Sequence, residues 1–273
     1  MSKRTQTPTM QIVTITPEMA KKWLGNNTEN RGLSKATIAA YARDMAQSRW
    51  IADGSPIRFN GDGLMLDGQH RLHACIEAGV PFQSFVVFGL PTDVRRTIDT
   101  GRPRRISDYL RIQGLPQSNR LGTVVANLWR IKQGRVEGRV TISESLEILE
   151  RHKNLLEWVR ISDHNLGITG VSPGILAAVS YLGGELLGED QKARSFVDVF
   201  RTGIPAYKGD AAHALRERTI KGRMSGPHYA LRQRSQLWAV IHAWNLFRKR
   251  TRMDKFPLPT RPIAMDGLDV SRI

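Results

Sequence analysis

The sequence predicts an α+β protein in which an N-terminal α/β domain is followed by an all-α helical domain. Up to about residue 100, short runs rich in β-branched and aromatic residues alternate with segments whose apolar residues recur at helical spacing. Beyond about residue 100, segments whose apolar residues recur at helical spacing are separated by polar stretches. No run approaches the roughly 18 consecutive apolar residues of a membrane span, and a single cysteine, Cys75, excludes an intramolecular disulfide.

The N-terminal domain is predicted to span residues 11–105, after a polar tail of residues 1–10 that we expect to be disordered. Its expected elements, in chain order, are a strand over 11–16, a helix from Pro17 capped by Thr16, a helix within 33–50 capped by Ser34, a hairpin over 55–68, a helix over 69–78 and a buried strand over 82–91. Alternation of Ile57 and Phe59 and the turn residues Asn60–Gly63 favour the hairpin.

The helical domain is predicted to span residues 106–255, with 256–273 as a C-terminal tail. Its expected helices lie within 118–134, 141–163, 172–188, 190–203, 210–222 and 234–250. The segment 141–163 opens with a capping box, Thr141 and Glu144. Trp238 and Trp244 fall on an apolar stripe, which indicates core positions.

The charge balance is strongly basic. The chain has 41 Lys and Arg against 25 Asp and Glu, a net charge of +16 and a pI near 10.6. Such an excess favours a polyanionic partner, nucleic acid before a membrane surface, because neutralising phosphates releases counterions. Between Arg216 and Arg252, ten cations face one acid, Glu217; the alternative interpretation of such a run is a solvated face. The predicted DNA contacts are Arg102, Arg104, Arg105, Arg216, Arg218, Lys221, Arg223, Arg232, Arg234, Arg248, Lys249 and Arg250.

The stretch "LMLDGQHRLHACIEAGV" (64–80) places polar residues where a strand becomes a helix. Gly68 permits a sharp bend, and Arg71 then lies in the first helical turn, where a cation opposes the helix dipole. A phosphate held by Gly68, Gln69, His70 and Arg71 would offset that cost. Asp67 would orient His70 or hold Mg²⁺. The alternative is that Arg71 pairs with Asp67 and caps the turn locally.

A second phosphate-contact segment is predicted at "TIDTGRPRR" (97–105), after the last strand. There Asp99 and Thr100 would reach a metal or a sugar, and the arginines that follow would reach phosphates. The alternative is a linker turn with Asp99 as a helix cap.

"LDGQHRLHAC", preceded by "SPIRF" and followed by a buried strand, resembles the ParB/sulfiredoxin superfamily over about residues 10–100. Gly68, His70 and Arg71 match its G-x-[HR]-R motif, and Gln69 stands where sulfiredoxins have their cysteine. The resemblance implies a nucleoside triphosphate, CTP or ATP, bound with Mg²⁺. The whole chain is also similar to ParB-like proteins of bacteriophage and actinobacterial genomes, through "LSKATIAAYARDMAQSRW", "TIDTGRPRRISDYL" and "HAWNLF".

Together these observations predict a ParB-like DNA-binding protein with a phosphate site at Asp67–Arg71. One alternative is an enzyme, a metal-dependent nuclease or an NTPase or phosphotransferase, with Asp67, His70 and Arg71 as catalytic residues. Another is a phage-encoded adaptor or inhibitor of a host protein. The N-terminal "MSKRTQTPTM" has no apolar region of a secretory signal, so we expect a cytoplasmic protein without a membrane partner. The oligomeric state stays open, with a homodimer as one form.

Overall fold

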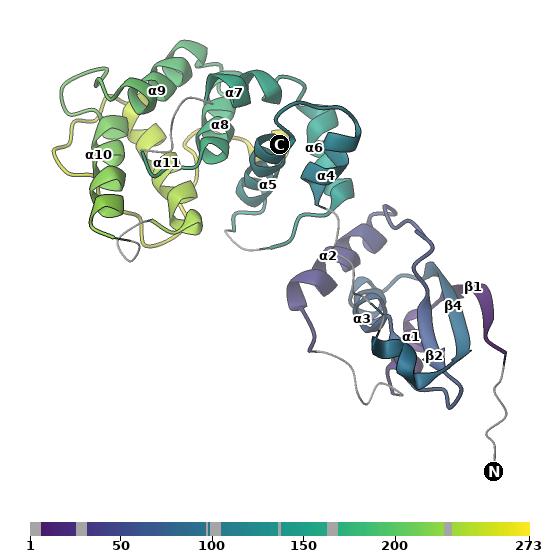
Figure 1. Cartoon of the computed structure of the whole chain (residues 1–273). Coiled ribbons are helices and arrows are strands. Elements are labelled where there is room, and N and C mark those ends of the chain that lie inside the picture. Colours follow the sequence, from purple (N-terminus) through teal and green to yellow (C-terminus); the bar gives the residue numbers. More distant parts are fainter. Residues whose placement is uncertain are drawn as a thin grey trace. The chain divides into compact units, whose positions relative to one another are not determined.

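The computed structural model describes residues 7–25, 32–96, 98, 105–135, 138–162, 169–226 and 231–273. The chain forms two compact units, residues 1–103 and 104–273 (Figure 1). This division lies within two residues of the predicted boundary. The N-terminal unit contains the sheet and the second unit is helical, so the chain is a mixed α+β protein.

The N-terminal unit is built on a four-stranded mixed sheet with the order β1-β4-β2-β3. Its strands are β1 (Thr9–Ile15), β2 (Ile57–Asn60), β3 (Met65–Asp67) and β4 (Phe82–Leu90). β1 pairs antiparallel with β4, β2 and β3 form an antiparallel hairpin, and β2 runs parallel to β4. β1 begins two residues before the predicted strand, so Thr9 and Met10 belong to the sheet and not to the expected tail.

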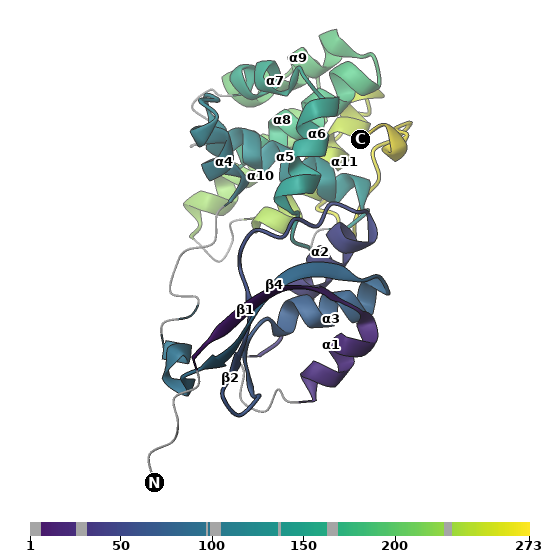
Figure 2. The ribbon, with the colours of Figure 1, turned by 90° about the vertical axis from the view of Figure 1, so that its right-hand side faces the viewer.

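Three helices lie on one face of this sheet (Figure 2). They are α1 (Pro17–Leu24), α2 (Lys35–Ala46) and α3 (Gln69–Ala78), and the short 3-10 helix η1 (Thr92–Arg96) follows β4. Ile15, Ile57 and Leu72 are fully buried between helices and sheet. On the opposite face Met10 and Ile12 are exposed, as the alternation of side chains along a strand requires.

The helix limits follow the predicted capping residues. The Thr16 hydroxyl accepts a hydrogen bond from the Met19 amide at 3.3 Å, and the Ser34 hydroxyl accepts one from the Thr37 amide at 3.3 Å. Gly79 ends α3 in the left-handed conformation, with φ of 69°. These bonds satisfy amides that the helix itself leaves without acceptors.

The second unit packs its helices around one apolar core. The helices are α4 (Ile106–Ile112), α5 (Ser118–Lys132), α6 (Ile142–Arg151), α7 (Leu155–Ile161), α8 (Pro173–Tyr181), α9 (Asp190–Thr202), α10 (Ala211–Met224) and α11 (Gln233–Arg248), with the π-helix η2 (Leu182–Leu186) and the 3-10 helix η3 (Val270–Arg272). Trp238 and Trp244 are buried in this core, as predicted. No described helix is both long enough and apolar enough to cross a lipid bilayer.

Three features of this unit differ from the sequence prediction. The helix expected over 141–163 is broken at His152–Asn154 into α6 and α7. The helix expected over 172–188 changes after Tyr181 to π geometry. The segment 256–273 is not a tail, because Phe256, Met265 and Ile273 are buried in the core of the unit. These apolar residues occur in irregular backbone, which has no periodic signal in the sequence.

Candidate functional site

The predicted strand-to-helix turn forms as expected. β3 ends at Asp67, Gly68 is the N-cap with φ of 110°, and α3 begins at Gln69. A Cβ on Gly68 would lie 2.8 Å from Cγ1 of Ile57, which is fully buried. Only glycine therefore fits this turn, for its positive φ and for the close approach to β2.

Asp67 is the centre of a hydrogen-bonded cluster inside the turn. Its Oδ1 accepts from the Gly68 amide at 2.6 Å, and its Oδ2 accepts from Arg58 Nη1 at 2.7 Å and from Arg71 Nη2 at 3.2 Å. Both carboxylate oxygens thus have donors from the protein. Among the described residues, no group of three or more His, Cys, Asp or Glu side chains is placed to hold a metal ion. The Mg²⁺ ligation predicted for Asp67 stays a prediction without a supporting donor set.

The Arg71 guanidinium points back into the protein. It donates to the carbonyl oxygens of Ser55 and of Pro56, the latter at 2.8 Å, in addition to Asp67. Only 11% of its side chain is exposed. The structure therefore shows the alternative in which Arg71 pairs with Asp67, and the guanidinium joins α3 to the segment before β2. In this arrangement Arg71 holds the turn together rather than facing an external phosphate.

His70 has a similar role between two helices. Its Nε2 accepts a hydrogen bond from the Ser34 amide at 3.0 Å, which joins the first turn of α3 to the N-cap of α2. An accepting Nε2 requires the ring proton to be on Nδ1. Gln69, predicted to contact phosphate, is buried at 5% exposure. The atoms that an enzyme would use as acid, base and metal ligand are thus engaged in contacts that hold the fold.

Cys75 lies in the core of the N-terminal unit. Its side chain is fully buried, and burial together with the charge of Glu18 raises the pKa of its thiol to about 11. A protonated, buried thiol is a poor nucleophile. Cys75 therefore does not replace the cysteine that sulfiredoxins have at the position of Gln69.

The second predicted phosphate-contact segment is described only at its end. Asp99, Thr100, Arg102 and Arg104 lie outside the described residues. Arg105 is the N-cap of α4, where its amide donates to Asp108 Oδ2 at 2.9 Å, and it is exposed.

Several cations predicted to contact DNA form ion pairs within the protein. Arg216 donates to the Phe200 carbonyl and to Glu217 at 2.9 Å. Arg248 pairs with Glu189 and with the Asp266 carbonyl, and Lys249 pairs with Asp266. The sequence segment 216–252 contains one acid, Glu217. Glu189 and Asp266 lie outside this segment in the sequence, but in the folded chain they pair with its cations. Arg216, Arg248 and Lys249 therefore have acidic partners within the protein, and their contact with phosphates stays a prediction.

The remaining predicted cations are exposed. They are Arg218, Lys221, Arg223, Arg232 and Arg250, whereas the side chain of Arg234 is outside the described part. Arg218 and Lys221 lie three residues apart on α10 and so share a face of the helix. Neither of the two makes an ion pair with a described residue.

Sequence reasoning missed a cluster of cations formed by two distant segments. The Met253 amide donates to the Gly209 carbonyl at 3.0 Å, so the segment that contains Lys208 lies against the segment that contains Arg250 and Arg252; all three cations are exposed. The Arg250 guanidinium lies 5.8 Å from the centre of the Tyr207 ring. We call Lys208, Arg250 and Arg252 the basic corner; none of them forms an ion pair with a residue that the structure describes. The sequence shows the three cations but not that their segments adjoin, because the contact between Gly209 and Met253 joins residues far apart in the chain.

The two parts of the chain thus differ in their chemistry. The turn at Asp67–Arg71 uses its polar groups internally, and the helical unit presents unneutralised positive charge. Comparison of this chain with protein-family models, with curated proteins and with solved structures finds no match.

Proposed function

We propose that this chain is a ParB-like protein that binds duplex DNA through its helical unit. The proposal depends on one observation, the basic corner of three exposed cations that lack acidic partners among the described residues. The helical unit has 28 Lys and Arg against 16 Asp and Glu, so +12 of the net +16 belongs to it. Clustered positive charge of this kind binds phosphates irrespective of base sequence.

The distribution of ion pairs supports this surface. On α9, Lys192 and Arg201 are exposed and Arg194 is half-buried, and the three lie against carboxylates at 3.4, 2.6 and 2.9 Å, respectively. Those cations have little net field, because each has an acid beside it. At the basic corner the charge is not cancelled in this way, and Arg218 and Lys221 on α10 likewise form no ion pair with a described residue. A polyanion gains most where positive charge is unneutralised.

Tyr207 gives the basic corner a second recognition element. Its ring packs against Phe247, with the ring centres 5.8 Å apart, and its hydroxyl donates to the Phe247 carbonyl at 3.3 Å. The ring is thereby fixed under the Arg250 guanidinium. A fixed ring holds the guanidinium in one position and so lowers the entropy lost when it contacts a phosphate.

The resemblance of "LDGQHRLHAC" to the ParB/sulfiredoxin superfamily favours DNA over other polyanions. Nucleotide binding at Asp67–Arg71 is not part of this proposal, because a phosphate there would have to displace Asp67 or the Ser55 and Pro56 carbonyls from Arg71.

The test is the salt dependence of DNA affinity, measured by fluorescence anisotropy with a labelled duplex between about 50 and 200 mM salt. The variant Lys208→Gln/Arg250→Gln/Arg252→Gln removes the basic corner. The matched control Lys192→Gln/Arg194→Gln/Arg201→Gln removes the same formal charge from ion-paired positions on α9. Three lost phosphate contacts should reduce the slope of log K against log salt by about 2.7, at ~0.9 per contact.

The control variant should keep a wild-type slope. Equal losses in both variants would show that only net charge matters and would contradict the basic corner as the interface. Affinity that hardly changes with salt, or displacement of the duplex by RNA in preference to DNA, would contradict the proposal as a whole.

A further inference from the structure

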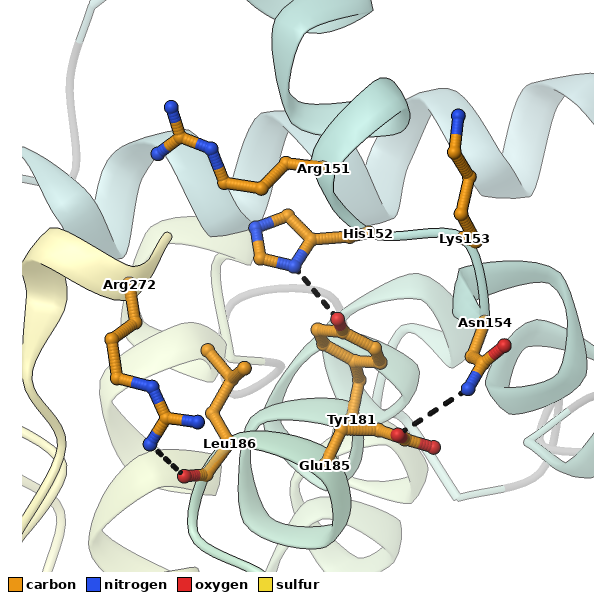
Figure 3. A pocket seen from close by; sticks show the side chains of 8 residues that line it. All are labelled: Arg151, His152, Lys153, Asn154, Tyr181, Glu185, Leu186 and Arg272. Carbon is orange, nitrogen blue, oxygen red and sulfur yellow. Dashed lines mark hydrogen bonds between the residues drawn. The ribbon is translucent and has the colours of Figure 1, made fainter.

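Two features of the molecule lie outside the residues of the proposed DNA surface. One is a pocket of about 510 Å³ in the helical unit, whose polar groups are used within the fold (Figure 3). There the His152 ring is bonded to the Tyr181 hydroxyl at 2.7 Å, which joins the end of α6 to α8, and Arg272 donates to the Leu186 carbonyl, which joins η3 to η2. The other feature is the edge of the sheet at β1, whose main chain is paired on one side.

β1 lies at one edge of the four-stranded sheet, next to β4 (Figure 1). β4 pairs with all seven of its residues. Apart from this pairing, no hydrogen bond joins the main chain of Thr9–Thr14 to another residue that the structure describes. The outer side of β1 therefore presents main-chain donors and acceptors to which a further strand can bind.

The two edges of this sheet differ in how they are protected from such pairing. β3, at the opposite edge, has three residues, and its Asp67 is bonded to Arg58 and Arg71. β1, with the sequence TMQIVTI, contains no charged residue and no proline, and it pairs with β4 without a bulge. Short length, charge, proline and bulges are the devices by which proteins prevent edge strands from pairing further. β1 has none of them.

β1 also exposes apolar side chains on the face of the sheet that the helices leave open. Met10 is 64% exposed and Ile12 is 63% exposed. In the pairing with β4, Met10 lies opposite Val87 and Ile12 lies opposite Phe85. Side chains of opposite residues share a face of the sheet, so these four apolar residues adjoin. Apolar side chains that are grouped on a surface are typical of protein–protein contacts.

We propose that β1 pairs antiparallel with β1 of a second copy of this chain, so that the two sheets become one. Such a pair has a twofold axis, and both copies make identical contacts. Opposite residues must face the same side of the sheet, so the axis passes through a residue. Ile12 is the middle residue of β1, and an axis there pairs the whole strand. Ile12 then lies opposite Ile12 of the second copy, and Met10 lies opposite Thr14.

The charge distribution favours a second copy at this edge. The chain has a net charge of +16, so the basic surfaces of two copies repel each other. Residues 1–103 contain 13 Lys and Arg against 9 Asp and Glu, which is +4 of this charge, and β1 contributes none of it. Two copies can therefore approach through β1 without placing like charges opposite each other.

The sequence around β1 limits the association to two copies. Pro8 precedes the strand and Pro17 follows it at the start of α1, which confines the pairing to the residues between them. Pairing uses the β1 edge of both copies, and the joined sheet then ends in the short, charged β3 on each side. The contact is closed, so a dimer and not a fibre is expected.

The test is the mass of the full chain in solution, measured without DNA by sedimentation velocity. One strand pair is a small interface, so the protein concentration should run from about 1 to 100 µM. We expect the mass to rise from 30.7 kDa toward twice this value. Ile12→Lys places two like charges opposite each other at the axis and should weaken dimerisation by about tenfold or more. Ile51→Lys is the matched control, because Ile51 is 75% exposed in the same unit but outside the sheet.

A cross-link tests the register of the two strands. Ile12→Cys places two thiols opposite each other, at a Cα separation of about 4.5 to 5.5 Å that a disulfide can span. Met10→Cys is the control, because Met10 lies opposite Thr14 and the two new thiols are apart. Cys75 is buried and does not compete. We expect Ile12→Cys to form a disulfide-linked dimer under mild oxidation about tenfold faster than Met10→Cys, or more.

Other results would overturn the proposal. These are a mass of 30.7 kDa up to about 100 µM, equal dimerisation of Ile12→Lys and Ile51→Lys, or equal cross-linking of Ile12→Cys and Met10→Cys. A dimer that dissociates when salt is raised from about 50 to 200 mM would also contradict it, because salt does not screen contacts between uncharged residues. Since every measurement is made without DNA, failure of this proposal is distinct from failure of DNA binding at the basic corner.

Discussion

The Gly68→Ala substitution tests the geometry of the turn between β3 and α3. The added methyl group meets two separate costs. A residue with a side chain at φ of 110° is strained by about 1 to 3 kcal/mol. The new Cβ would also lie 2.8 Å from Cγ1 and 3.0 Å from Cγ2 of Ile57, and overpacking a buried side chain costs about 1 to 3 kcal/mol. We expect the free energy of unfolding of the N-terminal unit to fall by about 2 to 6 kcal/mol.

Gly79→Ala at the other end of α3 is the matched control. Gly79 also has positive φ, 69°, but no atom lies within 4 Å of the position that its new methyl group would take, so only the backbone cost of about 1 to 2 kcal/mol applies. Urea unfolding of the full chain, followed by hydrogen exchange of peptides from α3 and β4, reports on the N-terminal unit separately from the helical one.

A double variant checks the cause of the difference. Ile57→Ala removes both γ carbons that the new methyl group meets, so its cost and that of Gly68→Ala should be less than additive. Equal costs at Gly68 and Gly79, or additive costs with Ile57→Ala, would refute the close approach of the turn to β2.

Three further predictions concern charged and titratable side chains. Asp67→Asn should lower the free energy of unfolding by about 1 to 3 kcal/mol in urea, since Arg58 and Arg71 lose their anion; unchanged stability would contradict its role at the centre of the turn. His70→Ala should cost about 0.5 to 1.5 kcal/mol by removing the acceptor of the Ser34 amide, and a Mg²⁺-dependent cleavage of DNA or of a nucleoside triphosphate that is lost in this variant would show catalysis instead. Burial lowers the pKa of His152 below its usual 6.5, so the native state binds fewer protons than the unfolded state and stability should fall as the pH drops below about 6.5. Burial also lowers the pKa of His242, so His242 contributes to this pH dependence in the same direction. Because both residues contribute, the check is whether the free energy of unfolding of His152→Gln depends less steeply on pH than that of the wild type.

The elements of the N-terminal unit could be predicted because their signals are local. Thr16 and Ser34 cap helices through bonds to amides three residues later, and Gly79 ends α3 with a conformation that glycine adopts readily. The capping box of Thr141 and Glu144 marks the start of α6 for the same reason, with bonds of 2.9 and 3.1 Å. Such signals depend on residues that are close in sequence.

The features that sequence reasoning missed depend on contacts between distant residues. α6 ends at His152 because its ring is bonded to Tyr181 on another helix, and helical periodicity alone continues through that position. Arg248 is neutralised by Glu189, so a count of acids within its own segment overstates the free charge. At the turn, the bend at Gly68 followed from its residue type, whereas the direction of Arg71 depends on the Ser55 and Pro56 carbonyls, which carry no sequence signal.

The turn at Asp67–Arg71 and the basic corner together show when a cation is evidence that a ligand binds. A guanidinium that is 11% exposed, as in Arg71, must have acceptors inside the protein, and those acceptors are reason enough for its position. An exposed cation without an acid beside it adds nothing comparable to the fold, and a cluster of them destabilises the native state through mutual repulsion. Lys208, Arg250 and Arg252 are of the second kind, so an anion from outside the chain would relieve their mutual repulsion. Unneutralised charge is for this reason a stronger indication of a partner here than the polar motif at Asp67–Arg71, whose residue types alone fit a phosphate site.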